Sequence, residues 1–362
     1  MKIKFFTLYH NNLIDFTNEL KKRQKIVFML PQKYKKLQIL NKEEIEYLNY
    51  RNLKLFGKTT MYYPIFKLFK SIKKDDTHII VKHLFQPINF LIFLICKFKK
   101  KQLIIYQQDL NEINSKFKIL FIKSFFKLIT PKNIKAFSVT KQGTNELKKY
   151  LNHVKYIPMP IEDEKFSKRK PKQNKKELNI LTVGKLTQDI KNHSFLVKSI
   201  EKIKQNNPNI KINLTLIGAF KEQNDIYNNL LKITKKSNLD NINIIKNMPY
   251  NKIQKEFAKH DLFILPSIKE SLGYSIIEAM SAGLPIICSN TCGAKSYIEN
   301  NKNGYIFNLK KENDLQYKIQ NFIKNNAIDT NKINQMSKNN IEIIKNNHDP
   351  KTNVEKFSKL LK

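Results

Sequence analysis

Two carboxylates, Glu270 and Glu278, bracket a loop of small residues that contains Gly273. A loop that leaves a parallel strand and enters a helix presents unpaired N–H groups and the positive end of the helix dipole, and both attract anions. Gly273 lets a ligand approach the backbone closely, because glycine has no side chain. The loop therefore predicts a phosphate site. A structural alternative stays open: Ser275 and Glu278 have the spacing of a capping box, and Glu270 would then be an ordinary solvated acid.

The elements around this loop are those of a parallel α/β sheet. An apolar run at 262–265 predicts a short buried strand, and Pro266-Ser267 is a turn signal. A helical pattern follows at about 275–281, stops at Ala282-Gly283, and gives way to another apolar strand at 284–288. This strand–loop–helix–strand order indicates an α/β fold.

Two lysines follow an earlier strand in the same way. The run 178–183 predicts a buried strand that ends at Gly184-Lys185-Leu186, and Lys191 comes five residues after Leu186. Two cations at the carboxyl end of a strand, beside a glycine turn, can neutralise a diphosphate. Because the chain has 67 Lys and Arg residues, the cations alone are weak evidence, and their register with Gly184 supports the interpretation.

The stretch from Glu270 to Pro285 resembles the E-x7-E signature of retaining glycosyltransferase family 4. The residues 261–267 before it, Gly304 after it and the element from Gly184 to Lys191 are similar too. The resemblance implies a GT-B fold, in which two Rossmann-like doubly wound domains face a cleft. It also implies a nucleotide-sugar donor, retention at the anomeric carbon and no requirement for a metal or another cofactor.

The resemblance also implies roles for individual residues. Glu270 is expected to hydrogen-bond the hydroxyls of the donor sugar and Glu278 the ribose, while Lys185 and Lys191 hold the departing diphosphate. Glu270, Lys191 and Lys185 are thus the expected catalytic set, in which electrostatic stabilisation of the leaving group is the main effect. The expected donor-binding residues are Gly184, Lys185, Lys191, Asn247, Glu270, Ser271, Leu272, Gly273, Tyr274 and Glu278.

The sequence departs from the family pattern at several of these positions. Lys185 stands where arginine is usual, so a point charge replaces a bidentate contact. Asn247 replaces a glycine in a turn that resembles the place where relatives hold the base, and asparagine tolerates a positive φ. Gln108 stands where a histidine is common. Gln108 and His83 are further cleft candidates, although a lone histidine near a strand end is more often structural.

The predicted domains are an acceptor-binding domain at 1–170, a nucleotide-sugar-binding domain at 171–345 and a terminal helix at 346–362 that crosses back. The charged, proline-containing stretch 164–176 predicts the linker. Further predicted strands are 2–8, 25–30, 78–81, 103–106, 136–140, 212–217 and 243–245, and further helices are 64–73, 84–98, 116–130, 143–151, 194–204, 226–235, 252–259 and 354–362.

The chain is strongly basic, with a net charge of +37, which raises nucleic acid or an anionic membrane as a partner. Lysines spread along the whole chain fit compositional drift equally well. The helix 116–130 has a basic face of Lys116, Lys123 and Lys127, which suits a membrane surface or a core helix with one solvated face. No run is long enough to span a bilayer, and three cysteines lack the partners of a zinc site. A cytoplasmic protein is expected, bound weakly and reversibly to the inner face of the membrane through the helix 116–130 and the basic stretch 67–74.

The leading functional hypothesis is a retaining hexosyltransferase that moves a sugar from a nucleotide-sugar donor to a glycan or lipid-linked acceptor. Its expected setting is the synthesis of cell-surface polysaccharide or glycolipid. A sugar-nucleotide epimerase of the same fold would not need the E-x7-E pattern. A basic nucleic-acid-binding protein would explain the charge, but no recognised binding module occurs in the sequence. The sugar, the base, the acceptor and the oligomeric state stay open.

Overall fold

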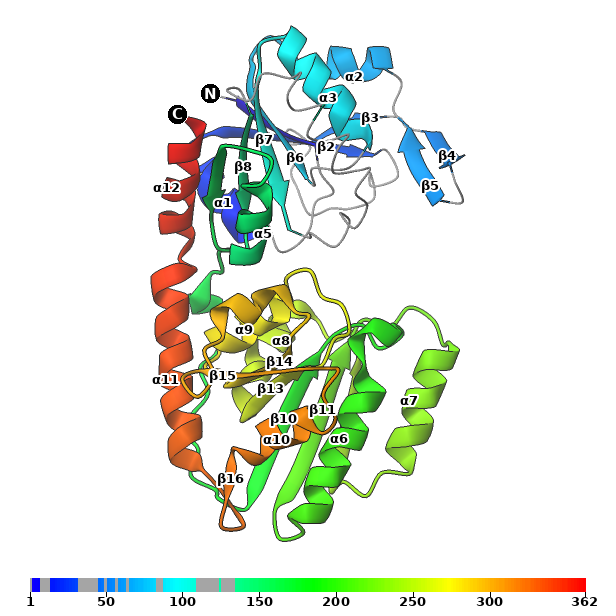
Figure 1. Ribbon diagram of the computed structural model, residues 1–362, viewed down its shortest axis with the longest axis vertical. Coiled ribbons are helices and arrows are strands. Elements are labelled where there is room, and N and C mark those ends of the chain that lie inside the picture. Colours follow the sequence, from blue (N-terminus) through cyan, green and yellow to red (C-terminus); the bar gives the residue numbers. More distant parts are fainter. Residues whose placement is uncertain are drawn as a thin grey trace. The chain divides into compact units, whose positions relative to one another are not determined.

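The computed structural model describes residues 2–6, 14–31, 45–48, 51–55, 58–62, 65–82, 87–108, 124 and 134–362. The chain divides into two compact units, residues 1–160 with 350–362 and residues 161–349. Each unit is a parallel sheet with helices packed on it (Figure 1). The predicted fold class, α/β with two doubly wound units, is confirmed. The roles assigned to the domains 1–170, 171–345 and 346–362 stay predictions.

The sheet of the first unit has the strand order β3-β2-β1-β6-β7-β8-β9. Every neighbouring pair is parallel. The strands are β1 (Lys2–Phe6), β2 (Lys25–Pro31), β3 (Ile45–Leu48), β6 (Asp76–Lys82), β7 (Gln102–Gln107), β8 (Ile134–Ser138) and β9 (His153–Tyr156). A separate antiparallel hairpin joins β4 (Arg51–Leu55) and β5 (Lys58–Tyr62).

Helices cover both faces of this sheet, because alternate strand residues point to opposite sides. One face packs against α2 (Ile65–Ser71), α3 (Pro87–Phe98) and α5 (Lys141–Leu147). The other carries α1 (Ile14–Lys21) and α12 (Pro350–Leu361). There the ring of Phe357 lies 5.2 Å from that of Phe16 and 5.3 Å from that of Phe137, between centroids. The last helix is therefore part of the core of the first unit.

Two predictions for the first unit fall outside the described residues. The helix 116–130 lies there except for Ser124, and so does His83. The helix predicted at 143–151 begins earlier, at Lys141, because Thr140 caps it through a hydrogen bond from the backbone N–H of Gly143.

The sheet of the second unit has the order β12-β11-β10-β13-β14-β15, all parallel. The strands are β10 (Glu177–Val183), β11 (Lys211–Gly218), β12 (Asn241–Lys246), β13 (Leu262–Leu265), β14 (Ile286–Ser289) and β15 (Gly304–Phe307). In chain order this is 3-2-1-4-5-6, so the winding reverses between β10 and β13. Open α/β sheets bind their ligands outside the carboxyl ends of the strands at such a switch point.

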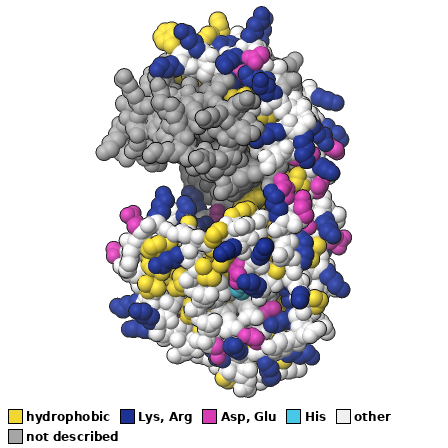
Figure 2. Space-filling view, turned by 180° about the vertical axis from the view of Figure 1, so that it is seen from behind, with side chains coloured by type: hydrophobic (Ala, Val, Ile, Leu, Met, Phe, Trp, Pro, Cys, Tyr) yellow, Lys and Arg dark blue, Asp and Glu magenta, His cyan; other side chains and the backbone are white. Residues whose placement is uncertain are grey.

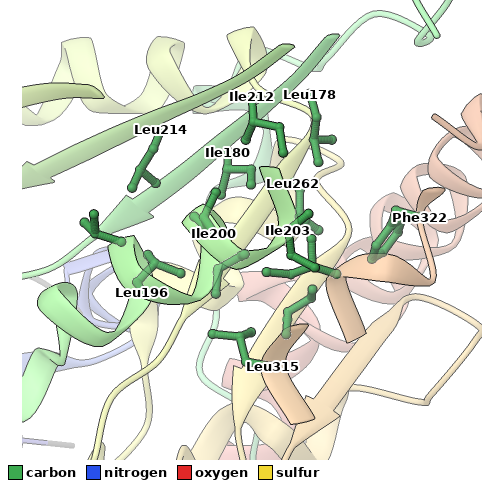
Figure 3. Packing of buried hydrophobic residues seen from close by; sticks show 14 of the residues in the cluster. Leu178, Ile180, Leu196, Ile200, Ile203, Ile212, Leu214, Leu262, Leu315 and Phe322 are labelled. Carbon is green, nitrogen blue, oxygen red and sulfur yellow. The ribbon is translucent and has the colours of Figure 1, made fainter. Parts of the chain in front are cut away.

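One face of this sheet forms the main core of the second unit (Figure 3). The α-helices described in the second unit are α6 (His193–Asn206), α7 (Asp225–Lys235), α8 (Tyr250–Glu256), α9 (Tyr274–Ser281), α10 (Asp314–Gln320) and α11 (Thr330–Asn347). The core contains side chains of α6, α7, α10 and α11. Every second side chain of a strand points to this face. It packs against helix side chains that are three or four residues apart and therefore share one side of the helix. The packed side chains include Leu178, Ile180, Ile212, Leu214, Leu262, Leu196, Ile200, Ile203, Leu315 and Phe322.

The stretch predicted as the linker is fastened to the second unit. Both Arg169 and Lys172 pair with Asp261, at 3.6 Å and 2.8 Å between nitrogen and oxygen. The backbone N–H of Lys172 also donates to the side-chain oxygen of Asn334 at 2.7 Å. The side chains of Arg169, Lys172, Asp261 and Asn334 are all at least half buried. Because Asp261 directly precedes β13, these contacts attach the predicted linker to the start of that strand.

Candidate active site

Two loops meet at the switch point of the second unit, one after β10 and one after β13. The backbone N–H of Ile268, in the second loop, donates to the carbonyl of Ile190, in the first, at 2.8 Å. All residues predicted to bind the donor diphosphate and sugar lie on these two loops or at the helix that follows the second. The sheet topology therefore places the candidate site here, independently of any motif.

An ion pair between Lys191 and Glu270 joins the two loops. The ammonium of Lys191 contacts Oε2 of Glu270, and both side chains are more than four-fifths buried. The methylene carbons of Lys191 run across Gly184, 3.3 Å from the position that a Cβ there would take. Lys185 is exposed, and no ion pair involving it occurs among the described residues. The arrangement offers one cation held in an ion pair, one exposed cation and a carboxylate within a single loop pair.

Helix α9 begins at Gly273, which has φ 81° and ψ 58°, a left-handed conformation that suits glycine. No side chain in the described part of the chain caps this helix start. The capping-box alternative is therefore wrong: because Gly273 is the N-cap, Ser275 and Glu278 both lie inside the helix. Glu278 is buried, with 6% of its surface exposed. An uncapped helix start beside a lysine is a natural anion site.

The loop before α9 is held by a segment that the sequence analysis did not single out. The N–H of Gly293 donates to the carbonyl of Glu270 at 3.1 Å, and the N–H of Ala294 to that of Leu272 at 2.6 Å. A Cβ at Gly293 would lie 2.0 Å from the carbonyl oxygen of Ser271, so only glycine fits. In the sequence, Gly293 is marked only as a glycine a few residues after a predicted strand. Its contact with Ser271, some twenty residues earlier, could not be read from the local pattern.

A buried histidine lies under the first loop and was also missed from the sequence. His193, the first residue of α6, is 5% exposed, and its ring carbon Cε1 lies 3.6 Å from the Cβ position of Gly184. Burial lowers the pKa of His193 to about 4, while the carbonyls of Lys185 and Gly184 oppose that shift. Neither ring nitrogen makes a full hydrogen bond to a described residue. The imidazole is therefore neutral near pH 7.

The turn after β12 is built around Asn247, whose φ of 50° confirms the predicted positive value. Its side-chain oxygen accepts from the N–H of Phe220 at 2.8 Å, and its side-chain nitrogen donates to the carbonyl of Phe220 at 2.7 Å. The ammonium of Lys246 lies 4.1 Å from the centre of the Phe220 ring. The Asn247 side chain is thus committed to joining two strand ends, which leaves backbone groups to contact a base.

The remaining predicted groups lie elsewhere. Gln108 is partly buried and follows β7 in the first unit, and His83 is outside the described residues.

Cys96, Cys288 and Cys292 are free thiols and all are buried. In the described part of the chain, no group of His, Cys, Asp and Glu residues could hold a metal ion. Within the same residues, no helix has both the length and the apolar character needed to cross a membrane.

Comparison with known proteins locates similarity mainly in the second unit. A family model described as "Glycosyl transferases group 1" matches residues 163–343, which is half of the chain. Among curated proteins, Protein CapJ of Staphylococcus aureus is 30% identical over 132 residues, 36% of this chain and 32% of CapJ. The GtfA subunit of a UDP-N-acetylglucosamine–peptide N-acetylglucosaminyltransferase of Streptococcus agalactiae is 25% identical over 169 residues, 46% of this chain and 32% of that subunit. The chain thus spans about a third of the length of these two relatives.

Solved structures match over the whole chain. A glycosyltransferase from Rickettsia africae has a TM-score of 0.74 and 18% identity, covering 100% of this chain and 98% of that one. HepE of Anabaena, solved in complex with UDP, has a TM-score of 0.76 and 16% identity, covering 100% and 99%. At these identities the similarity shows a shared fold.

Proposed function

Because the chain belongs to the group 1 glycosyltransferases and has their GT-B fold, we propose that it is a retaining hexosyltransferase that uses a nucleotide-sugar donor. The observation that carries the proposal is the contact of Lys191 with Glu270 beside the uncapped start of α9. A cation, a carboxylate and a helix N-terminus are what a sugar diphosphate needs: charge neutralisation for the phosphates and an acceptor for sugar hydroxyls.

The proposed donor is a uridine diphosphate sugar. HepE is described in complex with UDP and with UDP-glucose, and the GtfA enzyme is named for UDP-N-acetylglucosamine. In the proposed complex, Lys191 turns from Glu270 toward the diphosphate, and Glu270 is released to accept hydrogen bonds from sugar hydroxyls. Lys185, whose side chain is exposed, swings onto the same phosphates. The backbone of Ser271, Leu272, Gly273 and Tyr274, Gly184 beneath Lys191, and the carboxylate of Glu278 against the ribose complete the donor site.

Catalysis in this proposal is mainly stabilisation of the leaving group. Negative charge grows on the diphosphate as the sugar departs, and groups already held in place at that point lower the barrier without further reorganisation. The neutral ring of His193 fits this arrangement, because a charged imidazole beside Lys185 and Lys191 would repel both lysines.

The proposed acceptor is a glycan or a lipid-linked glycan at the inner face of the cytoplasmic membrane, bound by the first unit. The relatives do not narrow this choice, since their names include a peptide N-acetylglucosaminyltransferase, a sulfoquinovosyl transferase and a D-inositol 3-phosphate glycosyltransferase. The setting proposed is synthesis of cell-surface polysaccharide or glycolipid.

A thermal-shift screen of nucleotide sugars tests the donor, because a ligand that binds only the folded state raises the melting temperature. UDP-glucose and UDP-N-acetylglucosamine should stabilise the wild-type chain, and Lys191→Ala should lose most of that shift. Lys198→Ala, an exposed lysine on α6, is the matched control and should keep it. No shift with any uridine diphosphate sugar would overturn the donor assignment. Conversion of the donor sugar to its epimer, without acceptor, would overturn transferase activity.

A further inference from the structure

The first unit exposes large apolar side chains on two neighbouring helices, α2 and α3. Phe66 is 84% exposed and Phe98 is 77% exposed, the two highest values for large hydrophobic side chains among the described residues. Leu94 joins them at 51%. Both helices bury their opposite sides, through Leu68 and Ile92 among others, so core packing does not account for the exposed groups.

These side chains form one continuous ridge, which we call the α2–α3 ridge: Phe66, Phe69, Leu94 and Phe98. The rings of Phe69 and Phe98 join the helices, with centroids 5.7 Å apart. Phe66 precedes Phe69 by three residues and Leu94 precedes Phe98 by four, so each pair shares a helix face. The ammonium of Lys99 lies 4.1 Å from the centre of the Phe69 ring and fixes the junction.

Lysines surround the ridge. The exposed ones on α2, α3 and the segments after them are Lys67, Lys70, Lys73, Lys74, Lys97 and Lys100. Residues 65–101 contain only two acids, Asp75 and Asp76. Both pair with Lys2, and Asp76 is fully buried. At the top of Figure 2, hydrophobic side chains lie exposed among Lys and Arg side chains in this part of the first unit.

We propose that the α2–α3 ridge docks onto an anionic lipid bilayer, with Phe66, Leu94 and Phe98 entering the boundary between headgroups and acyl chains. Apolar side chains flanked by lysines on a helical surface are the pattern of interfacial membrane binding. Charge complementarity favours anionic lipid over an acidic protein, because exposed lysines and large exposed apolar side chains lie on the same two helices. Nucleic acid would engage the lysines but would leave the ridge in water.

This inference deepens the proposed membrane setting but does not depend on the donor site. The expected membrane contact was the helix 116–130 with the basic stretch 67–74, and the ridge adds exposed apolar side chains to the second of these. With no membrane-spanning helix in the described part of the chain, attachment through the ridge is peripheral and reversible. Salt should weaken it, since surface charges are screened at high ionic strength.

Co-sedimentation of the full chain with vesicles tests the proposal. Vesicles of equal parts phosphatidylcholine and phosphatidylglycerol should pellet the chain at low salt, and pure phosphatidylcholine should not. The double variant Phe66→Ser/Phe98→Ser should lower the partition coefficient about tenfold or more, because two apolar side chains no longer enter the interface. Lys67→Gln/Lys70→Gln/Lys97→Gln should weaken binding and flatten its salt dependence.

Matched controls lie in the second unit. Tyr317→Ser, also a highly exposed aromatic, and Lys310→Gln/Lys311→Gln/Lys338→Gln should leave the partition unchanged. Equal losses in the two triple lysine variants would overturn the proposal and leave diffuse charge as the cause. Unchanged binding in the phenylalanine variant, or tight nucleic-acid binding that depends on the lysines alone, would overturn it too.

The ridge variants should keep the wild-type melting temperature and the wild-type stabilisation by UDP-glucose. Those two measurements separate a failed fold from a failed membrane site. They also distinguish failure of this proposal from failure of the proposed transferase activity.

Discussion

At the scale of single residues, the site depends on which group Lys191 faces. Its ammonium is neutralised by Glu270, so two partly buried charges satisfy each other across the two loops. Removing one partner of such a pair leaves the other charge uncompensated and partly desolvated. The sequence alone placed both residues at the donor, but it could not show that they touch, because 79 positions separate them.

Replacing Glu270 with Gln should abolish most transfer with little loss of stability, because the amide oxygen can still accept a hydrogen bond from the Lys191 ammonium. The amide keeps the size but loses the charge, and one acceptor oxygen becomes a donor. We expect kcat to fall about 100-fold or more, on the scale of lost electrostatic groups in active sites. Glu299→Gln, which removes an exposed carboxylate paired with Lys302, is the control. Wild-type turnover in Glu270→Gln would refute its place at the donor sugar.

The buried His193 predicts a loss of stability in acid. Its pKa is near 6.5 in the unfolded chain and about 4 in the folded one. The folded state therefore resists protonation of this ring. The contribution of neutral His193 to the free energy of unfolding is complete above pH 6.5 and declines as the pH falls toward 4. A shift of this size corresponds to about 3 kcal/mol. Burial also lowers the pKa of His260, so other histidines add to the slope.

Denaturant unfolding between pH 7 and pH 4 checks this prediction. His193→Gln should be less steep than wild type over that interval, even if it is less stable at pH 7. His153→Gln, an exposed histidine, should follow the wild-type slope. If His193→Gln and wild type lose stability in parallel, the ring is not held neutral by burial.

At the scale of elements, local pattern predicted the strands and the extent of α9 well, but not how that helix is capped. The strand 262–265 was placed to the residue, because a short apolar run between polar residues has one good interpretation. The helix was expected from about Ser275 and begins at Tyr274. The capping-box alternative at Ser275 and Glu278 fails, because the left-handed Gly273 is the N-cap. A backbone conformation of this kind is not visible in residue types.

Gly293 predicts a large effect of a single methyl group. In Gly293→Ala the new Cβ meets the carbonyl of Ser271, so the loop that carries the donor-binding N–H groups must shift. We expect about 1–3 kcal/mol of destabilisation, typical of overpacking, together with weaker UDP binding. Ser275→Ala is the comparison and should cost less than about 0.5 kcal/mol, because Ser275 is not the cap. Equal effects of the two changes on the free energy of unfolding would contradict this account.

At the scale of the whole molecule, the order of strands carries more functional information than the motifs do. The reversal between β10 and β13 brings together two loops that are distant in sequence. The loop after β10 carries Lys191 and the loop after β13 carries Glu270. Resemblance predicted the two-unit fold. The role of Gly293 was not predictable because it contacts Ser271 in an earlier loop, and that of His193 was not because its burial beneath Gly184 depends on tertiary packing. No element was predicted between residues 305 and 345, although β15, α10 and α11 lie largely there.

The terminal helix makes the first unit depend on residues far along the chain. Phe357→Ala should remove about 3–5 kcal/mol from the stability of the first unit, because its ring is fully buried against Phe16 and Phe137. Lys351→Ala, exposed on the same helix, should change stability little. Hydrogen exchange should show the loss in β8 and α1 and not in β10. Loss of protection confined to the second unit would contradict this assignment of α12.

The central claim is that Lys185 and Lys191 hold the diphosphate of the donor, and calorimetric titration with UDP tests it most directly. Each substitution by alanine should weaken binding by roughly 1–3 kcal/mol, the scale of a lost hydrogen bond to a charged group. The double variant should bind more weakly than either single variant, and Lys198→Ala should match the wild type. UDP binding of wild-type strength in Lys185→Ala/Lys191→Ala would contradict the account, because the diphosphate would then lie elsewhere.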